Sequence, residues 1–153
     1  MVMTRKTPDY RKILLCLVCF ILTGCPGVGD RLQPDEQTVL RVIGDNVCLL
    51  IPDARDYQPA NIAINLRGTS SQEQNITFSP ALQVTDDMLC ISPTFYHFPK
   101  QGQFIIKSVL TSKKYHNAPR KMVAGLAISE GRFTNLPLTD REILRPYSEI
   151  SRL

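Results

Sequence analysis

The sequence has few of the residues from which catalytic and metal sites are built. It contains two histidines, His97 and His116, and neither is spaced from a second ligand as a metal site requires. Ser70 and Ser71 lie in a polar stretch without the Gly-x-Ser-x-Gly context of an activated nucleophile. A glycine-rich loop that could cradle a phosphate is also missing. We therefore predict a protein with no catalytic residues, no metal, no cofactor and no small-molecule substrate.

Positive charge is also scarce once the N-terminus is set aside. The whole chain has a formal net charge of +4. Residues 1–24 contain four of the 18 Lys and Arg residues and one of the 14 Asp and Glu residues, which leaves residues 25–153 with a net charge of +1. A protein that binds nucleic acid needs a basic face to neutralise phosphates. We therefore predict no nucleic-acid partner.

The N-terminus has the features of a secretory signal. Residues 13–22 form an uninterrupted apolar run, which is too short to span a bilayer as a permanent helix. Four basic residues precede this run: Arg5, Lys6, Arg11 and Lys12. This order of a positive segment and an apolar segment predicts a signal peptide over residues 1–24.

The stretch Leu22-Thr23-Gly24-Cys25 is typical of a bacterial lipobox. Thr23 and Gly24 are small enough for a peptidase site, and the Cys25 thiol can take up diacylglycerol before cleavage makes it the first mature residue. An ordinary signal peptide with a chance cysteine and an uncleaved signal anchor are the alternatives. Two or three acyl chains hold a protein stably at a membrane. We expect a lipoprotein anchored to membrane lipid through Cys25 and facing the periplasm of a bacterial cell envelope. Pro26, where enterobacterial lipoproteins retained in the inner membrane have aspartate, favours the outer membrane.

Processing at this site would leave one domain and one pair of cysteines. The 129 remaining residues are enough for a single core. Residues 25–37, rich in Gly, Pro and charge, predict a flexible tether, and residues 38–153 a single domain. Cys48 and Cys90 are an even pair in an oxidising compartment, and each lies in an apolar run. We predict a disulfide between them, with two buried free thiols as the alternative.

The domain has the pattern of a succession of short strands. Residues 61–66 and 104–111 alternate between apolar and polar positions, and Gly44-Asp45-Asn46 is a hairpin signal. Eleven prolines oppose long helices, and only residues 138–144, where Thr139 and Glu142 form a capping box, have a helical pattern. About seven or eight strands after an N-terminal signal helix predict an all-β, immunoglobulin-like antiparallel β-sandwich. A small β-barrel is the alternative.

Three segments are candidates for contact with a partner protein: the loop at residues 53–57, the aromatic stretch at 95–98, and residues 140–142. Aromatic and charged side chains can supply contact area, although ion pairs, caps and core packing account for each segment more simply. For His97, the role of a hydrogen-bonded turn residue is simpler than that of a general base. The candidate residues for partner binding are Asp53, Arg55, Asp56, Tyr57, Tyr96, His97, Asp140, Arg141 and Glu142.

The sequence also resembles a family of small enterobacterial lipoproteins, the type VI secretion system immunity periplasmic lipoproteins. Besides the lipobox, the resemblance lies in Asp56-Tyr57-Gln58-Pro59, in Leu89-Cys90-Ile91 followed by Phe95-Tyr96-His97-Phe98, and in Pro137-Leu138-Thr139-Asp140-Arg141-Glu142 followed by Arg145-Pro146-Tyr147. It covers nearly all of the mature chain, and its motifs are short and non-catalytic. It implies a lipid-anchored protein that binds an incoming toxin and covers its site. A structural or assembly lipoprotein of the cell envelope or the secretion machinery is the alternative.

Overall fold

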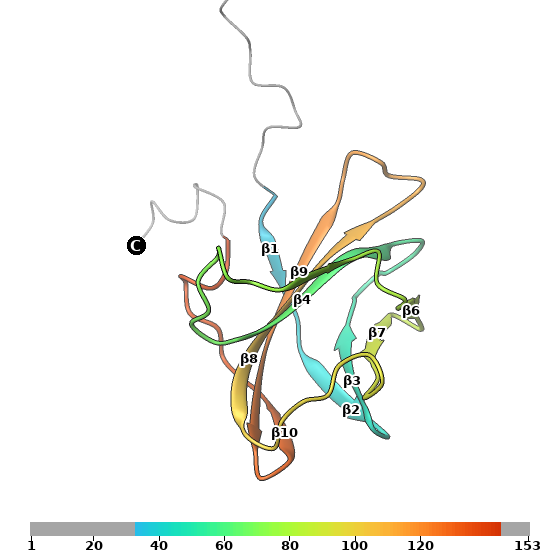
Figure 1. Ribbon diagram of the computed structural model, residues 1–153. Coiled ribbons are helices and arrows are strands. Elements are labelled where there is room, and N and C mark those ends of the chain that lie inside the picture. Colours follow the sequence, from blue (N-terminus) through green and yellow to red (C-terminus); the bar gives the residue numbers. More distant parts are fainter. Residues whose placement is uncertain (1–32, 145–153) are drawn as a thin grey trace, which may run out of the picture. The chain divides into compact units, whose positions relative to one another are not determined.

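The structure is a computed structural model that describes residues 33–144 (Figure 1). The predicted signal peptide, Cys25 and the first part of the predicted tether lie outside the described residues. Residues 33–144 form ten strands, and no helix among them is long and apolar enough to cross a membrane. The strands make two open sheets that share one core, so the β-sandwich is confirmed and the alternative of a closed barrel is wrong.

The larger sheet has the strand order β1-β9-β8-β4-β5. β10 also pairs with β9, next to β1 and on the side of β9 that faces away from β8. The six strands of this sheet are β1 (Asp35–Gln37), β4 (Gln58–Leu66), β5 (Ile76–Phe78), β8 (Gly102–Thr111), β9 (Arg120–Ser129) and β10 (Arg132–Asn135).

The smaller sheet is antiparallel and has the order β2-β3-β7-β6. The predicted hairpin at residues 44–46 joins its first two strands, and Gly44 has the positive φ of 59° that this turn needs. The four strands are β2 (Leu40–Ile43), β3 (Asn46–Leu50), β6 (Val84–Thr85) and β7 (Met88–Ile91).

β1 corrects two of the sequence predictions. It pairs in parallel with β9, with Asp35 opposite Lys121, so the larger sheet is mixed rather than antiparallel. It also lies within residues 25–37, so the domain begins before residue 38 and the predicted tether ends too late. The sequence hides this strand because its residues are polar. Main-chain pairing and an ion pair of 2.5 Å between Glu36 and Arg120 hold it in place.

Alternation along the long strands fills the core between the sheets. In β8, Phe104, Ile106 and Leu110 are buried, as the sequence pattern predicts. Ser108 shares this inward face, and its hydroxyl donates a 2.7 Å hydrogen bond to the main-chain oxygen of Asn61, so its polar group is satisfied. The smaller sheet contributes the other half of the core with the fully buried side chains of Leu49, Leu89 and Ile91.

Residues 136–144 form an irregular segment on the outer face of the larger sheet, although residues 138–144 have a helical pattern in the sequence. The Glu142 side chain accepts a 2.7 Å hydrogen bond from the Thr139 amide, so half of the capping box is present, but only a turn follows. Leu136 donates to the Gly125 oxygen of β9, and a Cβ atom at residue 125 would collide with the Leu136 carbonyl oxygen. This close contact holds the backbone of the segment against β9. A helix at this position would have to lie further from the sheet.

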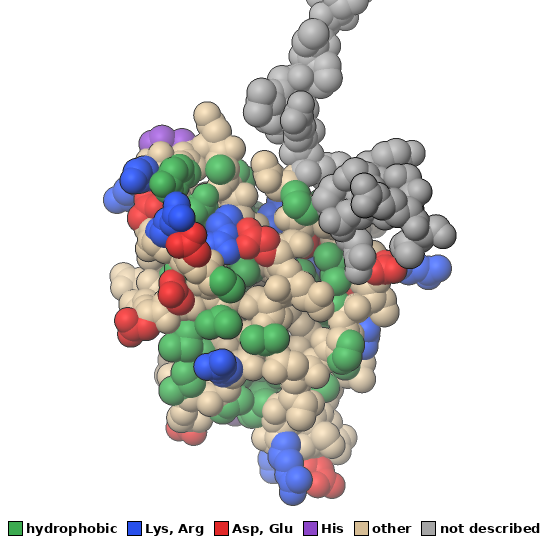
Figure 2. All heavy atoms as spheres, turned by 180° about the vertical axis from the view of Figure 1, so that it is seen from behind, with side chains coloured by type: hydrophobic (Ala, Val, Ile, Leu, Met, Phe, Trp, Pro, Cys, Tyr) green, Lys and Arg blue, Asp and Glu red, His purple; other side chains and the backbone are tan. Residues whose placement is uncertain are grey.

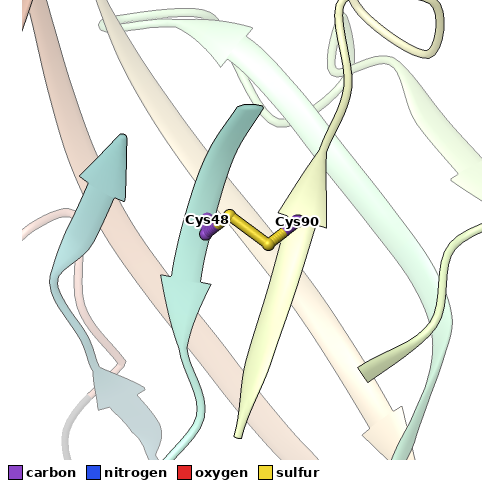
Figure 3. The surroundings of a disulfide bond; sticks show 2 residues. All are labelled: Cys48 and Cys90. Atoms are coloured by element: carbon purple, nitrogen blue, oxygen red, sulfur yellow. A yellow bond between two sulfur atoms is a disulfide. The ribbon is translucent and has the colours of Figure 1, made fainter. Parts of the chain in front are cut away.

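The predicted disulfide is present between Cys48 and Cys90 (Figure 3). The two residues are directly opposite each other on the neighbouring strands β3 and β7, with a Cα–Cα distance of 3.9 Å. In immunoglobulin domains the conserved disulfide joins the two sheets. Here the bridge lies within the smaller sheet and holds its two central strands together.

Two side-chain amides from the larger sheet each bind one residue at an edge of the smaller sheet. Asn135 of β10 accepts a 2.6 Å hydrogen bond from the Leu40 amide and donates one of 3.0 Å to the Leu40 oxygen. Gln58 of β4 binds the amide and oxygen of Val84 in the same way, at 2.9 and 3.2 Å. Each side-chain amide thus forms the two hydrogen bonds that a residue of a neighbouring strand would form. Both edge strands of the smaller sheet, β2 and β6, are thus tied to the larger sheet.

We expect Asn135→Ala to lower the free energy of unfolding by about 1 to 2 kcal/mol, because the Leu40 amide and oxygen would lose their partners. The matched control is Thr134→Ala on the same strand, since its hydroxyl makes only a long hydrogen bond of 3.4 Å at the surface. Urea unfolding of the two variants measures the difference. Equal midpoints would show that the Asn135 bridge contributes nothing.

Candidate protein-binding surface

The loop between β3 and β4 meets the connection between β8 and β9 at one end of the domain. A shallow hollow of about 250 Å³ lies between them, lined by side chains from both segments. We call this region the Tyr115 surface and define it by Asp53, Arg55, Tyr57, Tyr115 and Arg120. It unites candidates from the predicted loop with residues about sixty positions further along the chain.

Tyr57 is the fixed centre of the Tyr115 surface. It is buried, and its hydroxyl donates a 2.7 Å hydrogen bond to the Ala118 oxygen. The Tyr57 and Tyr115 rings stack with their centroids 6.4 Å apart, and the Arg120 guanidinium lies 5.5 Å from the Tyr57 ring centroid. Arg120 is held in turn by its ion pair with Glu36. The aromatic and cationic groups are therefore positioned before any partner arrives.

Arg55 is the exposed cation of this surface. Its guanidinium forms a 2.8 Å ion pair with Asp53 and donates a 3.4 Å hydrogen bond to the Tyr115 hydroxyl. Both Asp53 and Arg55 have positive φ angles, 54° and 47°, which are uncommon for side chains other than glycine. Ser79, Asp86, Asp87 and Glu130 share this conformation in other turns, so the angles describe how the loop turns and do not by themselves mark a site.

Asp56, another predicted contact residue, has a structural role in the same region. Its carboxylate accepts hydrogen bonds from the Ser112 hydroxyl at 2.8 Å and from the Lys114 amide at 3.1 Å. These bonds, above all the one from Ser112, lower the pKa of Asp56. Asp56 therefore fixes the β8–β9 connection that carries Tyr115.

The aromatic stretch at residues 95–98 lies near the β2–β3 turn, at the opposite end of the domain from the Tyr115 surface (Figure 1). Tyr96 is half-buried and packs edge-on against Phe98 and Phe104, with ring centroids 4.7 and 6.4 Å apart. His97 is exposed beside a second hollow of about 250 Å³. Most of this stretch therefore closes one end of the core, and His97 alone points outward.

The third candidate segment, Asp140-Arg141-Glu142, lies on the outer face of the larger sheet. Glu142 forms a two-point ion pair with Arg67, with N–O distances of 2.6 and 2.9 Å. The hydrogen bonds from Arg67 lower the pKa of Glu142 to about 2. Arg141 lines a hollow of about 340 Å³, and Asp140 belongs to the same surface turn. The structure does not bring these residues together with the Tyr115 surface.

The Arg67–Glu142 pair predicts a defined pH dependence of stability. Because the pKa of Glu142 in the folded protein lies below its ordinary value of 4.5, the pair stabilises the fold above pH 4.5, and this stability is lost as the pH falls towards 2. We expect the difference in unfolding free energy between wild type and Glu142→Gln to shrink over that range. Denaturant unfolding at several pH values measures it. Arg67→Met should flatten the profile in the same way, and parallel profiles of wild type and both variants would contradict the prediction.

The view in Figure 2 displays where charged and hydrophobic side chains gather. Side chains of both charges cluster at the end of the domain that carries the β8–β9 connection, and hydrophobic side chains are exposed further down. Within residues 33–144, no three His, Cys, Asp or Glu side chains are close enough to hold a metal ion. The Tyr115 surface presents stacked aromatic rings and paired charges.

Sequence reasoning missed Tyr115 and Arg120. Residues 113–116 (Lys-Lys-Tyr-His) have the composition of a solvated loop, and Arg120 looks like the first residue of a strand. A tyrosine beside two lysines was the one available signal, and it is weak without the position of Tyr57. Only the folded structure brings the two tyrosines together.

Comparison with known proteins places this sandwich in a family. Residues 35–131 match the family model described as Domain of unknown function (DUF7480), and the chain belongs to this family. The matched range runs from β1 to the turn after β9, so it includes the disulfide and the whole Tyr115 surface. No curated protein and no solved structure matches the chain.

Proposed function

We propose that this protein is a lipid-anchored periplasmic lipoprotein that binds a protein partner through the Tyr115 surface. The observation that carries the proposal is the stacked Tyr57–Tyr115 pair flanked by Arg55 and Arg120. Tyrosine and arginine are enriched in the residues that dominate protein–protein binding energy. Their mutual contacts also reduce the side-chain freedom that binding would otherwise remove.

The charges around this surface favour a partner with acidic groups. Lys113 and Lys114 lie beside Tyr115 and form no ion pair within the described part of the chain, and the Lys114 ammonium lies 5.5 Å from the Tyr115 ring centroid. Arg55 is paired only with the exposed Asp53. Acidic side chains on a partner could approach these cations and steer association.

The partner we propose is a toxin delivered by type VI secretion, which the protein would neutralise as an immunity protein. An inhibitor of this kind needs shape and charge rather than chemistry. The lipobox at residues 22–25 would hold it at the membrane on the periplasmic side, where such a toxin arrives. The family resemblance described above points to the same role. A lipoprotein that assembles the envelope or the secretion machinery would use the same surface for a permanent partner.

The test is growth rescue with a periplasmic toxin encoded beside the gene, together with the affinity of the two purified proteins. We expect rescue by wild type and a stable complex. Tyr115→Ala should weaken the complex about thirtyfold, because the variant loses the ring that stacks on Tyr57. His97→Ala is the control, since His97 is exposed at the other end of the domain.

Three results would count against parts of this proposal. Rescue without a detectable complex, lost in His97→Ala, would indicate an enzyme. Unchanged affinity of the Tyr115→Ala variant for the toxin would show that the Tyr115 surface is not part of the interface. Retention of a secretion or envelope component from the cell's own extract, with no complex between the two purified proteins, would favour an assembly role.

A further inference from the structure

The edge of the larger sheet at β5 differs from the edges of the smaller sheet. Asn135 and Gln58 each bind the amide and oxygen of one residue in the edge strands β2 and β6, whereas no side chain does this for β5, which pairs with β4 on one side only. Ser79 donates a 2.8 Å hydrogen bond to the Ala60 oxygen, and antiparallel strands alternate between residues bonded to the neighbour and residues facing away. The amides and oxygens of Ile76 and Phe78 therefore point to the open side, where no group of residues 33–144 binds them.

The side chains of this edge strand are apolar and exposed. Phe78 is 72% exposed and Ile76 46% exposed. Both lie on the outer face of the larger sheet, because they are opposite Asn61 and Ala63, which alternate with the buried Ile62. Natural proteins usually protect such an edge with charge, proline or a covering segment, because it can pair with another chain. β5 is short, as many protected edge strands are, but it contains no charged residue and no proline, and Phe78 is exposed beside its free backbone groups.

A basic hollow adjoins the N-terminal end of this strand. It has a volume of about 340 Å³, and its lining includes Gln74, two residues before β5, and the apolar side chains of Leu66 and Ile105. Lys107 and Arg141 also line it, and neither forms an ion pair within the described part of the chain. The one carboxylate of the hollow, Glu142, is held by Arg67. The hollow therefore offers two cations next to apolar surface.

We propose that an extended, acidic segment of another protein docks here by adding a strand to β5. Its backbone would bond to Ile76 and Phe78, and its apolar side chains would cover theirs. Its end would pass Gln74 and place carboxylates beside Lys107 and Arg141. β5 has three residues, so backbone pairing alone gives few hydrogen bonds, and the charge contact supplies the rest of the affinity and selects the partner. This surface is separate from the Tyr115 surface and does not depend on the immunity role.

The test is selection of peptides from a random library of 12-residue peptides on the purified full chain. We expect the selected peptides to combine alternating apolar residues with Asp or Glu at one end. Ile76→Pro removes the outward amide while leaving the pairing with β4, so it should weaken a selected peptide about tenfold or more. Ile76→Val keeps the amide and an apolar side chain and should bind like wild type.

Charge reversal in the basic hollow tests the electrostatic part of the proposal. Lys107→Glu with Arg141→Glu should weaken the acidic peptide about tenfold and favour the same peptide with lysine in place of its acidic residues. Tyr115→Ala should leave peptide binding unchanged, so the outcome is independent of the proposed function. Selected peptides without acidic residues, or binding that resists both the proline and the charge variants, would overturn the proposal. A dimer of the full chain that dissociates in Ile76→Pro would overturn it as well, by assigning the edge to a second copy.

Discussion

Replacement of Cys48 and Cys90 together by alanine is expected to lower the free energy of unfolding by up to about 4 kcal/mol. The two cysteines are 42 residues apart, and the chain-entropy model of a crosslink gives this value for a loop of that length. The intervening chain leaves the smaller sheet, forms β4 and β5 of the larger sheet and returns through β6. Without the disulfide, the unfolded chain gains the conformational entropy of this whole loop, which favours unfolding.

Thermal and urea unfolding of the double variant measure this effect. For a domain of this size, the loss corresponds to a fall in the midpoint temperature of roughly 10 to 20 °C. Reduction of wild type should give a similar midpoint, and the same reductant should leave the double variant unchanged. Two free thiols in protein taken from the periplasm, or an unchanged midpoint in the variant, would contradict the prediction.

Substitution of Cys25 by serine is expected to abolish lipid attachment altogether. In the predicted lipobox Leu22-Thr23-Gly24-Cys25, one thiol would take up the acyl group, and a serine hydroxyl would not replace it. The protein should then accumulate as a precursor or appear in the soluble fraction, because acyl chains are what would hold it stably at the membrane. Metabolic labelling with a palmitate analogue and fractionation of the envelope measure both effects.

The matched controls for this substitution lie in the same segment. Cys16 and Cys19 belong to the apolar run of the predicted signal peptide, so Cys16→Ser and Cys19→Ser should keep the label on the mature protein. Equal labelling of wild type and Cys25→Ser would rule out lipidation at Cys25. Retention of the N-terminal segment in the mature protein would indicate a signal anchor instead.

Local patterns predicted most of the fold. The alternation at residues 104–111 became β8 with the expected inward face, and Gly44 made the turn between β2 and β3. The pairing of Cys48 with Cys90 followed from their number and their apolar surroundings. Each of these features can be predicted without knowledge of the tertiary structure. They follow from side-chain periodicity, from the turn preference of particular residues and from the number of cysteines.

The failures occurred where distant segments decide the conformation. Asp35–Gln37 has no apolar alternation, yet it forms β1 because β9 offers an edge and Arg120 binds Glu36. Residues 138–144 have a capping box, yet they form no helix. Leu136, two residues before this segment, donates a hydrogen bond to the Gly125 oxygen and so holds the chain against β9. Local propensity is worth little per residue, so such tertiary contacts override it.

The same distinction applies to the candidate binding surface. The sequence singled out Asp53, Arg55, Asp56 and Tyr57 together, because they are neighbours in one polar loop. It could not distinguish Asp56, which holds the β8–β9 connection, from Arg55, which faces solvent. It also could not bring Tyr115 to Tyr57, since the two rings meet only when β4, β8 and β9 are paired.

By itself, the sequence determined the succession of strands and the pairing of the two cysteines, because both follow from residue types and local patterns along the chain. The lipoprotein signal remains a prediction from residues 22–25. The tertiary structure alone decided which strands share a sheet, where Asn135 and Gln58 bind the edge strands of the smaller sheet, and that β5 lies at an open edge. The physical reason is that an edge is a property of pairing. The same backbone groups are satisfied or free according to what the rest of the chain places beside them.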